Sequence, residues 1–202
     1  MIKTFLFDMG NVLVRFCHTR MCAQIGELCG RPGDDVREAL FGSELQWRFE
    51  RGFISEGEFH IQMEQLLEHA LDQEALIHAG SNIFELNESL VPILDALRAG
   101  GHRLVLLSNT SVSHFEFVQR TFDVLDRFDD FVLSYRVGAM KPEPAIYTAA
   151  LHAIQCEPRE CFYTDDIPDY VAQGRKFGLD AEVFTDTETF QQQLAARGIT
   201  VP

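Results

Sequence analysis

The sequence predicts an α/β fold, in which helices cover both faces of a parallel sheet. Short apolar runs alternate with segments of helical periodicity over residues 87–202, and such alternation is typical of right-handed strand-helix-strand units. Several of these runs lack polar alternation, which indicates strands buried on both faces. Polar residues directly follow several runs, and ligands bind at the carboxyl edge of such sheets. These polar positions are therefore candidate site residues.

The first predicted strand is the run Thr4–Phe7, which is entirely apolar or β-branched. Asp8 follows it, so we expect a carboxylate at the carboxyl end of a buried strand. Burying a carboxylate beside apolar residues is costly unless the group is paired or functional. Taken alone, Asp8 also fits an ordinary acid at the end of a strand, so its role depends on its neighbours.

After residue 14 the pattern becomes helical and stays so for about eighty residues. Ser55 and Glu58 form a capping-box pattern, with a hydroxyl at the N-cap and a glutamate three residues later. We expect a small helical bundle set over the site. Its first predicted helices span residues 19–29, which end at Gly30 and a Pro-Gly turn, then 34–41 and 44–50, and the capping box begins another.

Some polar residues of this bundle are expected to be exposed. Such residues usually form solvated faces, and contact with a substrate is the less common alternative for each. They are Arg48, Glu50, Arg51 and His60.

A helix over Asn87–Arg98 returns the chain to the sheet and ends before Gly100-Gly101, as glycines do at helix ends. The rest of the chain alternates between strands and helices. The expected strands are 103–107, 131–134, 161–164 and 181–184, and the expected helices begin near 113 and span 144–154, 168–177 and 187–197.

Composition limits the partners and the compartment. The 202 residues include 17 basic and 31 acidic side chains, which give a formal net charge of −14. This charge argues against nucleic acid or an anionic membrane as a partner. No apolar run is long enough for a membrane span, and the first strand begins almost at Met1, which leaves no room for a signal peptide. We therefore expect a cytoplasmic protein, and the sequence indicates no oligomeric state.

The five cysteines are an odd number without Cys-x-x-Cys spacing, so we expect reduced thiols in the core. A zinc site formed by Cys17, His18 and Cys22 is the alternative, but this spacing matches no common zinc motif.

Three later run ends carry side chains with useful chemistry. Together with Asp8 they supply a candidate nucleophile, hydroxyl and amide donors, a cation and a carboxylate pair. Each one alone also fits ordinary structure: a Ser/Asn turn, a solvated lysine before a rigid proline turn, or acids and a proline at a helix start. The three are Ser108-Asn109-Thr110 after 104–107, Lys141-Pro142-Glu143 after Met140, and Asp165-Asp166 after 161–164.

In this order and spacing, the four motifs resemble those of the haloacid dehalogenase superfamily and cover the whole chain. The sequence is most similar to the phosphatase-like branch, which includes sugar-phosphate phosphatases and carries a helical cap after the first motif. The resemblance implies a Rossmann-like core of residues 1–14 and 88–202 and an α-helical cap of residues 15–87. It also implies hydrolysis of small phosphorylated metabolites.

The resemblance assigns a role to each motif. Asp8 matches the nucleophile, which forms an aspartyl phosphate that water then hydrolyses. A Mg²⁺ ion is implied, held by Asp8, the Gly10 carbonyl and Asp166, and hard carboxylate oxygens suit this ion. Lys141 is expected against the aspartate and the phosphoryl group. The remaining implied residues are Ser108 and the Asn109 amide as phosphate donors, and Asp165 and Asp169 around the metal ligands.

Two positions depart from the family pattern. Gly10 stands where the phosphatases usually carry an aspartate that protonates the leaving oxygen, and general acid catalysis is typically worth ~10²–10⁴-fold. Some relatives resembling sugar-phosphate phosphatases share the Asp-x-Gly-Asn-Val form. Tyr170 stands where an asparagine or aspartate usually orients the metal's surroundings, although Asp169 beside it offers a carboxylate.

Three functions remain open from the sequence. A Mg²⁺-dependent phosphatase of small metabolites leads, because Asp165-Asp166 is of no use to a metal-free halide site. A haloacid dehalogenase needs no second aspartate, so Gly10 is compatible with it. A catalytically weak binding or regulatory protein is favoured by Gly10 and Tyr170 but disfavoured by the intact Asp8, Lys141 and Asp166.

Overall fold

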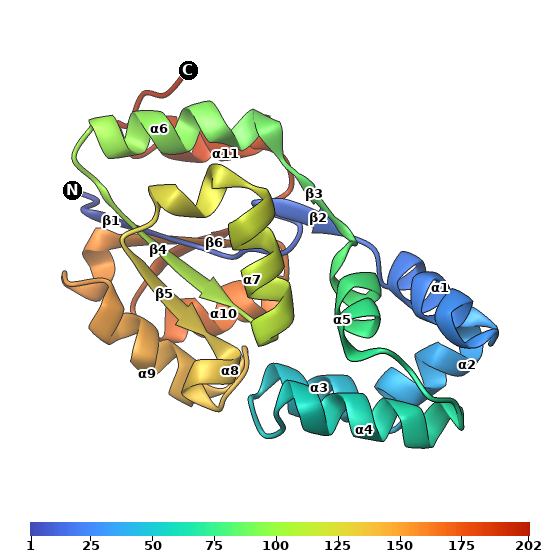
Figure 1. The fold of residues 1–202 in the computed structure, drawn as a ribbon. Coiled ribbons are helices and arrows are strands. Elements are labelled where there is room, and N and C mark those ends of the chain that lie inside the picture. Colours follow the sequence, from blue (N-terminus) through green and yellow to red (C-terminus); the bar gives the residue numbers. More distant parts are fainter.

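A five-stranded parallel sheet forms the centre of the protein, whose residues 1–202 are described by a computed structural model (Figure 1). The strand order is β5-β4-β1-β6-β7, and every neighbouring pair is parallel. The predicted α/β fold is therefore confirmed. The strands are β1 (Thr4–Phe7), β4 (Arg103–Ser108), β5 (Asp130–Leu133), β6 (Cys161–Asp165) and β7 (Asp180–Val183).

Helices cover both faces of the sheet because its strands are apolar on both sides. Phe5 and Phe7 of β1 pack in one cluster with α6 (Val91–Ala99), α7 (Val112–Thr121) and α11 (Thr187–Ala195). Leu6, between them, points to the opposite face and packs with α9 (Pro144–Ala153) and α10 (Pro168–Lys176). Short turns complete the core: η2 (Glu88–Leu90), η3 (Asp123–Arg127), α8 (Ser134–Val137) and η4 (Pro158–Glu160).

The helices of residues 18–81, called the cap below, lie beside the sheet and, together with Ile83, build a separate hydrophobic cluster of 17 buried residues (Figure 1). The predicted capping box is present, since Ser55 and Glu58 satisfy each other's backbone N–H groups at the start of α4. The elements are α1 (His18–Cys29), α2 (Gly33–Arg37), the π-helix η1 (Glu38–Gly42), α3 (Leu45–Glu50), α4 (Glu56–Leu67) and α5 (Gln73–Ser81).

Two strands join the cap to the core, and the sequence analysis missed both. Strand β2 (Val14–Phe16) pairs antiparallel with β3 (Phe84–Leu86), so the chain enters and leaves the cap along one ribbon. Three residues are too few for a period-2 pattern to stand out from a helical one. Helix α5 was also not predicted individually.

The cap also contacts the core at the end of α3. The Ser134 hydroxyl donates to the Glu50 carbonyl at 2.6 Å, and Arg51 forms an ion pair with Glu143. Gly52 has a φ of +68°, and a side chain there would overlap the carbonyl oxygen of Tyr135. This junction fixes the last turn of α3 against the sheet's carboxyl edge.

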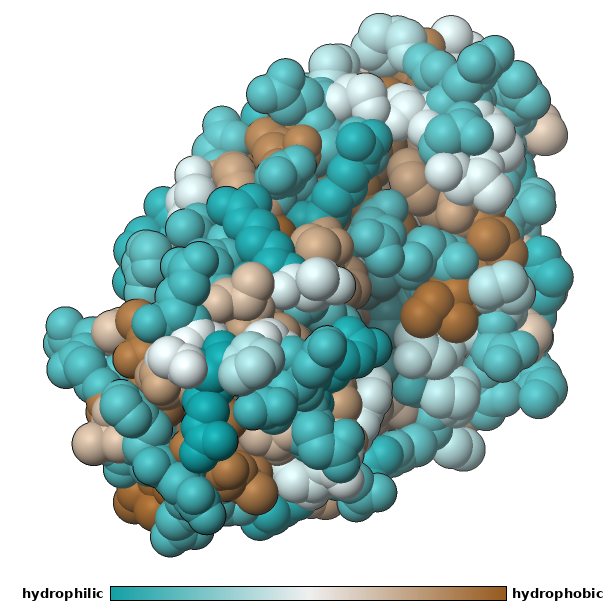
Figure 2. Space-filling view, turned by 90° about the vertical axis from the view of Figure 1, so that its right-hand side faces the viewer, coloured by the Kyte–Doolittle hydropathy of each residue, from teal (hydrophilic) through white to brown (hydrophobic).

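Seven large hydrophobic side chains are exposed: Met1, Leu28, Trp47, Phe53, Ile61, Leu66 and Ile167. On the face shown in Figure 2, hydrophobic residues lie as separate spots among hydrophilic ones. No helix is both long and apolar enough to cross a membrane. The cysteine prediction was partly wrong: all five thiols are free, but Cys17 is exposed and Cys156 is only half-buried.

Candidate active site

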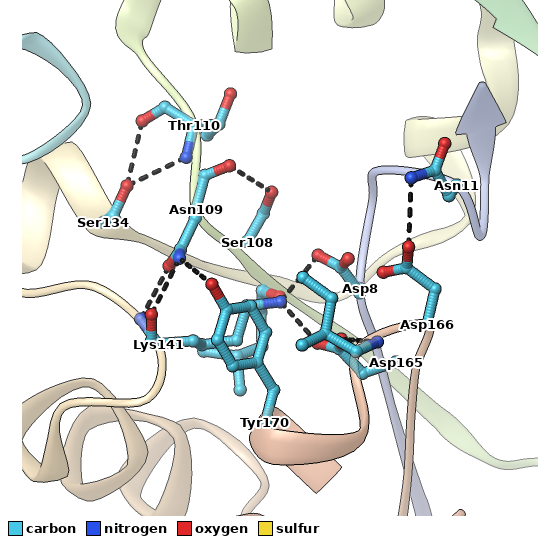
Figure 3. Close-up of polar contacts among 12 residues, drawn as sticks. Asp8, Asn11, Ser108, Asn109, Thr110, Ser134, Lys141, Asp165, Asp166 and Tyr170 are labelled. Atoms are coloured by element: carbon cyan, nitrogen blue, oxygen red, sulfur yellow. Dashed lines mark hydrogen bonds and ion pairs between the residues drawn. The ribbon is translucent and has the colours of Figure 1, made fainter. Parts of the chain in front are cut away.

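The four motifs meet at the carboxyl edge of the sheet (Figure 3). Asp8 directly follows β1, Ser108 ends β4 and Asp165 ends β6. Because β4, β1 and β6 are adjacent parallel strands, their carboxyl ends lie side by side. Lys141 reaches this edge from the loop between α8 and α9.

Lys141 lies at the centre of the polar contacts. Its Nζ lies 2.7 Å from Asp8 Oδ1 and 2.6 Å from Asp165 Oδ2, and it donates to the Leu107 carbonyl at 3.0 Å. The lysine is 3% exposed. Burial lowers its pKa, but the Asp165 and Asp8 carboxylates outweigh burial and raise the pKa above its ordinary value. The side chain is therefore a fixed cation, as the sequence predicted for its position against Asp8.

Asp165 anchors this lysine. Its Oδ2 also accepts a hydrogen bond from the Tyr163 hydroxyl at 2.6 Å, and its Oδ1 accepts one from the backbone N–H of Ile167 at 2.9 Å. Tyr163 sits two residues earlier on the same face of β6. Both carboxylate oxygens are thus engaged by protein donors. Asp169, expected near the metal ligands, is exposed on the first turn of α10 and does not line the cavity.

Three carboxylates are grouped at this edge: Asp8, Asp165 and Asp166 each offer an oxygen within 4.8 Å of the others. Burial raises the pKa of Asp8 to about 7, which the Lys141 ammonium opposes and the Asp165 carboxylate reinforces. Burial also raises the pKa of Asp166. A cation would offset this excess of negative charge, and the all-oxygen donor set fits a hard divalent ion such as Mg²⁺.

Asn11 is a site residue that the sequence analysis did not single out. Its Nδ2 donates to Asp166 Oδ2 at 3.0 Å, and its backbone has a φ of 54°. Asparagine adopts this left-handed region more easily than most residues. The only feature of the sequence that could have identified Asn11 as a site residue is its position after Gly10, in the turn that follows the first strand.

The Ser108-Asn109-Thr110 loop is hydrogen-bonded to the backbone of Lys141 through Asn109. The Asn109 side chain accepts from the Lys141 backbone N–H at 2.7 Å and donates to its carbonyl at 3.0 Å. Asn109 and Thr110 line the cavity, whereas Ser108 is buried and its hydroxyl donates to the Asn109 carbonyl at 3.4 Å. The amide side chain thus has a structural task that the sequence analysis did not foresee.

A cavity of about 190 Å³ opens above these residues, between the core and the cap. Asp8, Gly10, Lys141 and Asp166 line one side of it. Aromatic and imidazole rings line another side and contact one another in series, with centroids 5.0–6.2 Å apart. These rings, called the aromatic wall below, belong to Trp47, Phe41, His18, Phe16, Phe84 and His114.

The two residues that depart from the family pattern, Gly10 and Tyr170, both contact other residues of the site. A Cβ at Gly10 would lie 2.8 Å from Cε1 of Phe16, so a ring of the aromatic wall fills the space beside the glycine. The Tyr170 ring lies 5.2 Å from Lys141 Nζ, and its hydroxyl is 3.5 Å from Asn109 Nδ2. Tyr170 therefore contacts the lysine and its loop.

The expectation that Glu50 lies on a solvated face was wrong. It is 8% exposed and lines the cavity, and Gln46 Nε2 donates to its Oε1 at 2.8 Å. Burial raises the pKa of Glu50 to about 7, against the opposing hydrogen bond from Gln46. The other three residues differ: Arg48 is exposed, Arg51 pairs with Glu143, and His60 contacts the Leu71 carbonyl. Helical periodicity did not predict that the end of α3 docks on the core.

Known proteins share this sequence pattern and fold. A model of haloacid dehalogenase-like hydrolases matches residues 2–178. A D-ribitol-5-phosphate phosphatase of Bacteroides thetaiotaomicron is 26% identical over 97% of this chain and 94% of its own. A phosphatase of Mycobacterium tuberculosis is 26% identical over 89% of this chain and 86% of its own. A HAD family enzyme from B. thetaiotaomicron, solved with magnesium and inorganic phosphate, shares the fold with a TM-score of 0.82, at 23% identity over 92% of this chain and 95% of that one.

Proposed function

The chain belongs to the haloacid dehalogenase-like hydrolases, and we propose that it is a Mg²⁺-dependent phosphatase of small phosphorylated metabolites. The observation that carries the proposal is the contact of Lys141 with Asp8, which is one of three grouped carboxylates. The two phosphatase relatives and the magnesium and phosphate complex of the structural neighbour agree with it. Asp8, Lys141 and Asp166 line a cavity of about 190 Å³ in which a substrate could reach them.

Asp8 is proposed as the nucleophile. Its carboxylate attacks phosphorus, the bond to the leaving oxygen breaks, and water then hydrolyses the aspartyl phosphate. Lys141 holds Asp8 in position and offsets the charge that gathers on the phosphoryl oxygens. Ser108 and the backbone amide of Asn109 are proposed to bind the phosphoryl group, because they stand where β4 gives way to α7.

Asp8, the Gly10 carbonyl and Asp166 are proposed to hold the Mg²⁺ ion, since the oxygens of Asp165 are occupied by Lys141, Tyr163 and Ile167. The ion supplies positive charge for the phosphate oxygens. Asn11 orients Asp166 through its hydrogen bond. Asp165 supports this set by fixing Lys141, and a role for Asp169 would have to act at longer range.

A division of the chain into two parts supports this proposal. We assign residues 1–14 and 88–202 to the catalytic core, and residues 15–87, which add most of the β2–β3 ribbon to the cap helices, to the cap domain. The cap's hydrophobic cluster draws all its buried members from Met21 to Ile83, and the β2–β3 ribbon is the covalent link between the parts. The core thus carries the proposed nucleophile and metal ligands, and the cap closes the cavity.

The test is phosphate release from a panel of phosphorylated metabolites, with Mg²⁺ and with EDTA. We expect release that EDTA abolishes and excess Mg²⁺ restores. Asp166→Ala should raise the Mg²⁺ concentration needed for half-maximal activity or remove turnover, while Asp169→Asn serves as the matched exposed control. Metal-independent halide release from 2-haloacids, with no phosphate release, would replace the proposal with the dehalogenase.

A further inference from the structure

The proposed phosphatase reaction requires a group that donates a proton to the leaving oxygen. A phosphate ester of an ordinary alcohol releases an oxygen that must gain a proton, and Gly10 has no side chain to supply one. We propose that the Glu50 side chain of the cap is the acid that protonates the leaving oxygen. This inference rests on the proposed phosphatase function and names a further catalytic residue for it.

The direction of the reaction places the leaving oxygen toward the cap. Attack and departure are roughly in line at phosphorus, so the leaving oxygen lies on the side away from Asp8. Asp8 follows β1 at the sheet edge, and the cap lies across the same cavity. Glu50, the last residue of α3, lines that cavity from the cap.

Contacts with the core hold Glu50 in place. Its carbonyl accepts from the Ser134 hydroxyl at 2.6 Å, and the same hydroxyl accepts from the Thr110 backbone N–H at 2.9 Å. Thr110 follows Asn109, the proposed phosphate-binding residue. One serine therefore links the backbone of Glu50 to the loop that is proposed to position the phosphoryl group.

The carboxyl group has one engaged oxygen and one available oxygen. Oε1 accepts from Gln46 Nε2 at 2.8 Å, and Oε2 has no protein partner. No cation pairs with this carboxyl group, and its burial favours the neutral, protonated form near neutral pH, as a proton donor requires.

The other ionisable groups of the cavity suit the role less well. Asp8 is the proposed nucleophile, Asp166 a proposed metal ligand, and Lys141 is bound to two carboxylates. Burial lowers the pKa of His114 to about 4, and its ring contacts the Gly80 carbonyl, so it is neutral and donates away from the cavity centre. The remaining ones are His18, whose pKa burial lowers, and Tyr170, whose pKa burial raises.

The proton balance closes over one catalytic cycle. In the first step Asp8 attacks phosphorus, the bond to the leaving oxygen breaks, and that oxygen takes the proton of Glu50 and departs as the alcohol. In the second step water gives a proton to the Glu50 carboxylate, and the water oxygen attacks phosphorus. The bond between phosphorus and Asp8 then breaks. Inorganic phosphate leaves, and both carboxyl groups return to their starting states.

The experiment compares kcat/KM for phosphate esters whose leaving groups span a range of pKa. With Mg²⁺ present, Glu50→Gln should lower kcat/KM for alkyl phosphates such as glycerol phosphate by ~10²–10⁴-fold. It should change that for 4-nitrophenyl phosphate much less, because nitrophenolate leaves without a proton. The plot of log kcat/KM against leaving-group pKa should therefore be steeper in the variant. Glu50→Asp should retain part of the alkyl phosphatase activity.

Controls separate this role from a structural one. Glu27→Gln, on the exposed side of α1, should match the wild type, and inorganic phosphate should inhibit Glu50→Gln as it inhibits the wild type. Equal loss of activity for all leaving groups, or no loss for alkyl phosphates, would overturn the inference and leave the phosphatase function standing. If the wild type hydrolyses neither class of ester, the proposed function fails and the inference fails with it.

Discussion

The two sides of the cavity are built on different principles. On the core side, Asp8, Lys141 and Asp165 are buried polar groups joined by contacts of 2.6–2.7 Å. Asp8 follows β1 and Asp165 ends β6, while Lys141 comes from the loop between α8 and α9. On the side toward the cap, the aromatic wall consists of rings in mutual contact, contributed by α1, η1 and α3 of the cap, by the β2–β3 ribbon and by the core helix α7.

The two sides should also differ in how they respond to substitution. The core side resists change, because removing one partner of a buried ion pair leaves an uncompensated charge. In the aromatic wall, replacing one ring by an apolar side chain of similar volume should cost less stability. Glu50 and Gly10 are the points where the two sides meet, since Glu50 brings a carboxyl group from the cap to the cavity and Gly10 leaves room for the Phe16 ring beside Asp8.

Removing the proposed nucleophile should have the largest effect. Asp8→Asn should lower kcat by about 10⁴-fold or more, because the amide has nearly the same shape but is a poor nucleophile. Phosphate release and circular dichroism measure activity and fold. Asp169→Asn, on the exposed start of α10, is the matched control and should keep near wild-type kcat. An active Asp8→Asn enzyme would contradict the assignment.

Removing the central cation should damage both stability and rate. Lys141→Ala leaves Asp8 and Asp165 buried without their cation, which should cost roughly 3–5 kcal/mol in the free energy of unfolding at pH 8. The loss should shrink at pH 5, where Asp8 can protonate. Urea unfolding at both pH values measures this, with the exposed Lys176→Ala as control.

The same variant should lower kcat more than it raises KM, if the ammonium acts on charge that develops in the transition state. A change confined to KM would instead assign Lys141 to binding of the ground state.

The two sides also differ in how far the sequence predicted them. The core side followed from local pattern, because an apolar strand fixes where its next residue lies and parallel strands bring their ends together. The cap side did not, because the identity of its cavity residues depends on how α3 docks. Glu50 resembles a solvated helix residue in the sequence, and its burial goes with the docking of α3 on the core, where Ser134 contacts the Glu50 carbonyl and Gly52 lies against Tyr135. The short β2–β3 ribbon was not predicted for a related reason, because its two strands lie far apart in the sequence.

Glu50 should also weaken the fold as pH rises. Its pKa is about 7 in the folded chain against an ordinary 4.5, so between these values the folded state binds more protons than the unfolded state and stability falls with increasing pH. Glu50→Gln removes this dependence. The variant should therefore gain roughly 3 kcal/mol relative to wild type between pH 4.5 and pH 8, by urea unfolding. A constant difference across that range would show that Glu50 is ionised in the folded protein.

The smallest expected effect tests the contact between Gly10 and the aromatic wall. Gly10→Asp would place its Cβ 2.8 Å from Cε1 of Phe16, so the ring must move. Overpacking of this kind typically costs ~1–3 kcal/mol. Phe16→Leu removes the Cε1 and Cζ atoms, so adding it to Gly10→Asp should recover part of the loss. Urea unfolding of the two single variants and the double variant gives the coupling energy.

The same substitutions test whether position 10 and Glu50 supply one and the same proton. In the Glu50→Gln background, adding Gly10→Asp with Phe16→Leu should raise kcat/KM for alkyl phosphates, by up to ~10²-fold where the new carboxyl group reaches the leaving oxygen, and should leave aryl phosphates nearly unchanged. Phe16→Leu alone in that background is the control for the altered wall. A gain that is equal for alkyl and aryl esters would mean that the substitutions act by reshaping the cavity, because a proton donor speeds the poor alkyl leaving groups selectively.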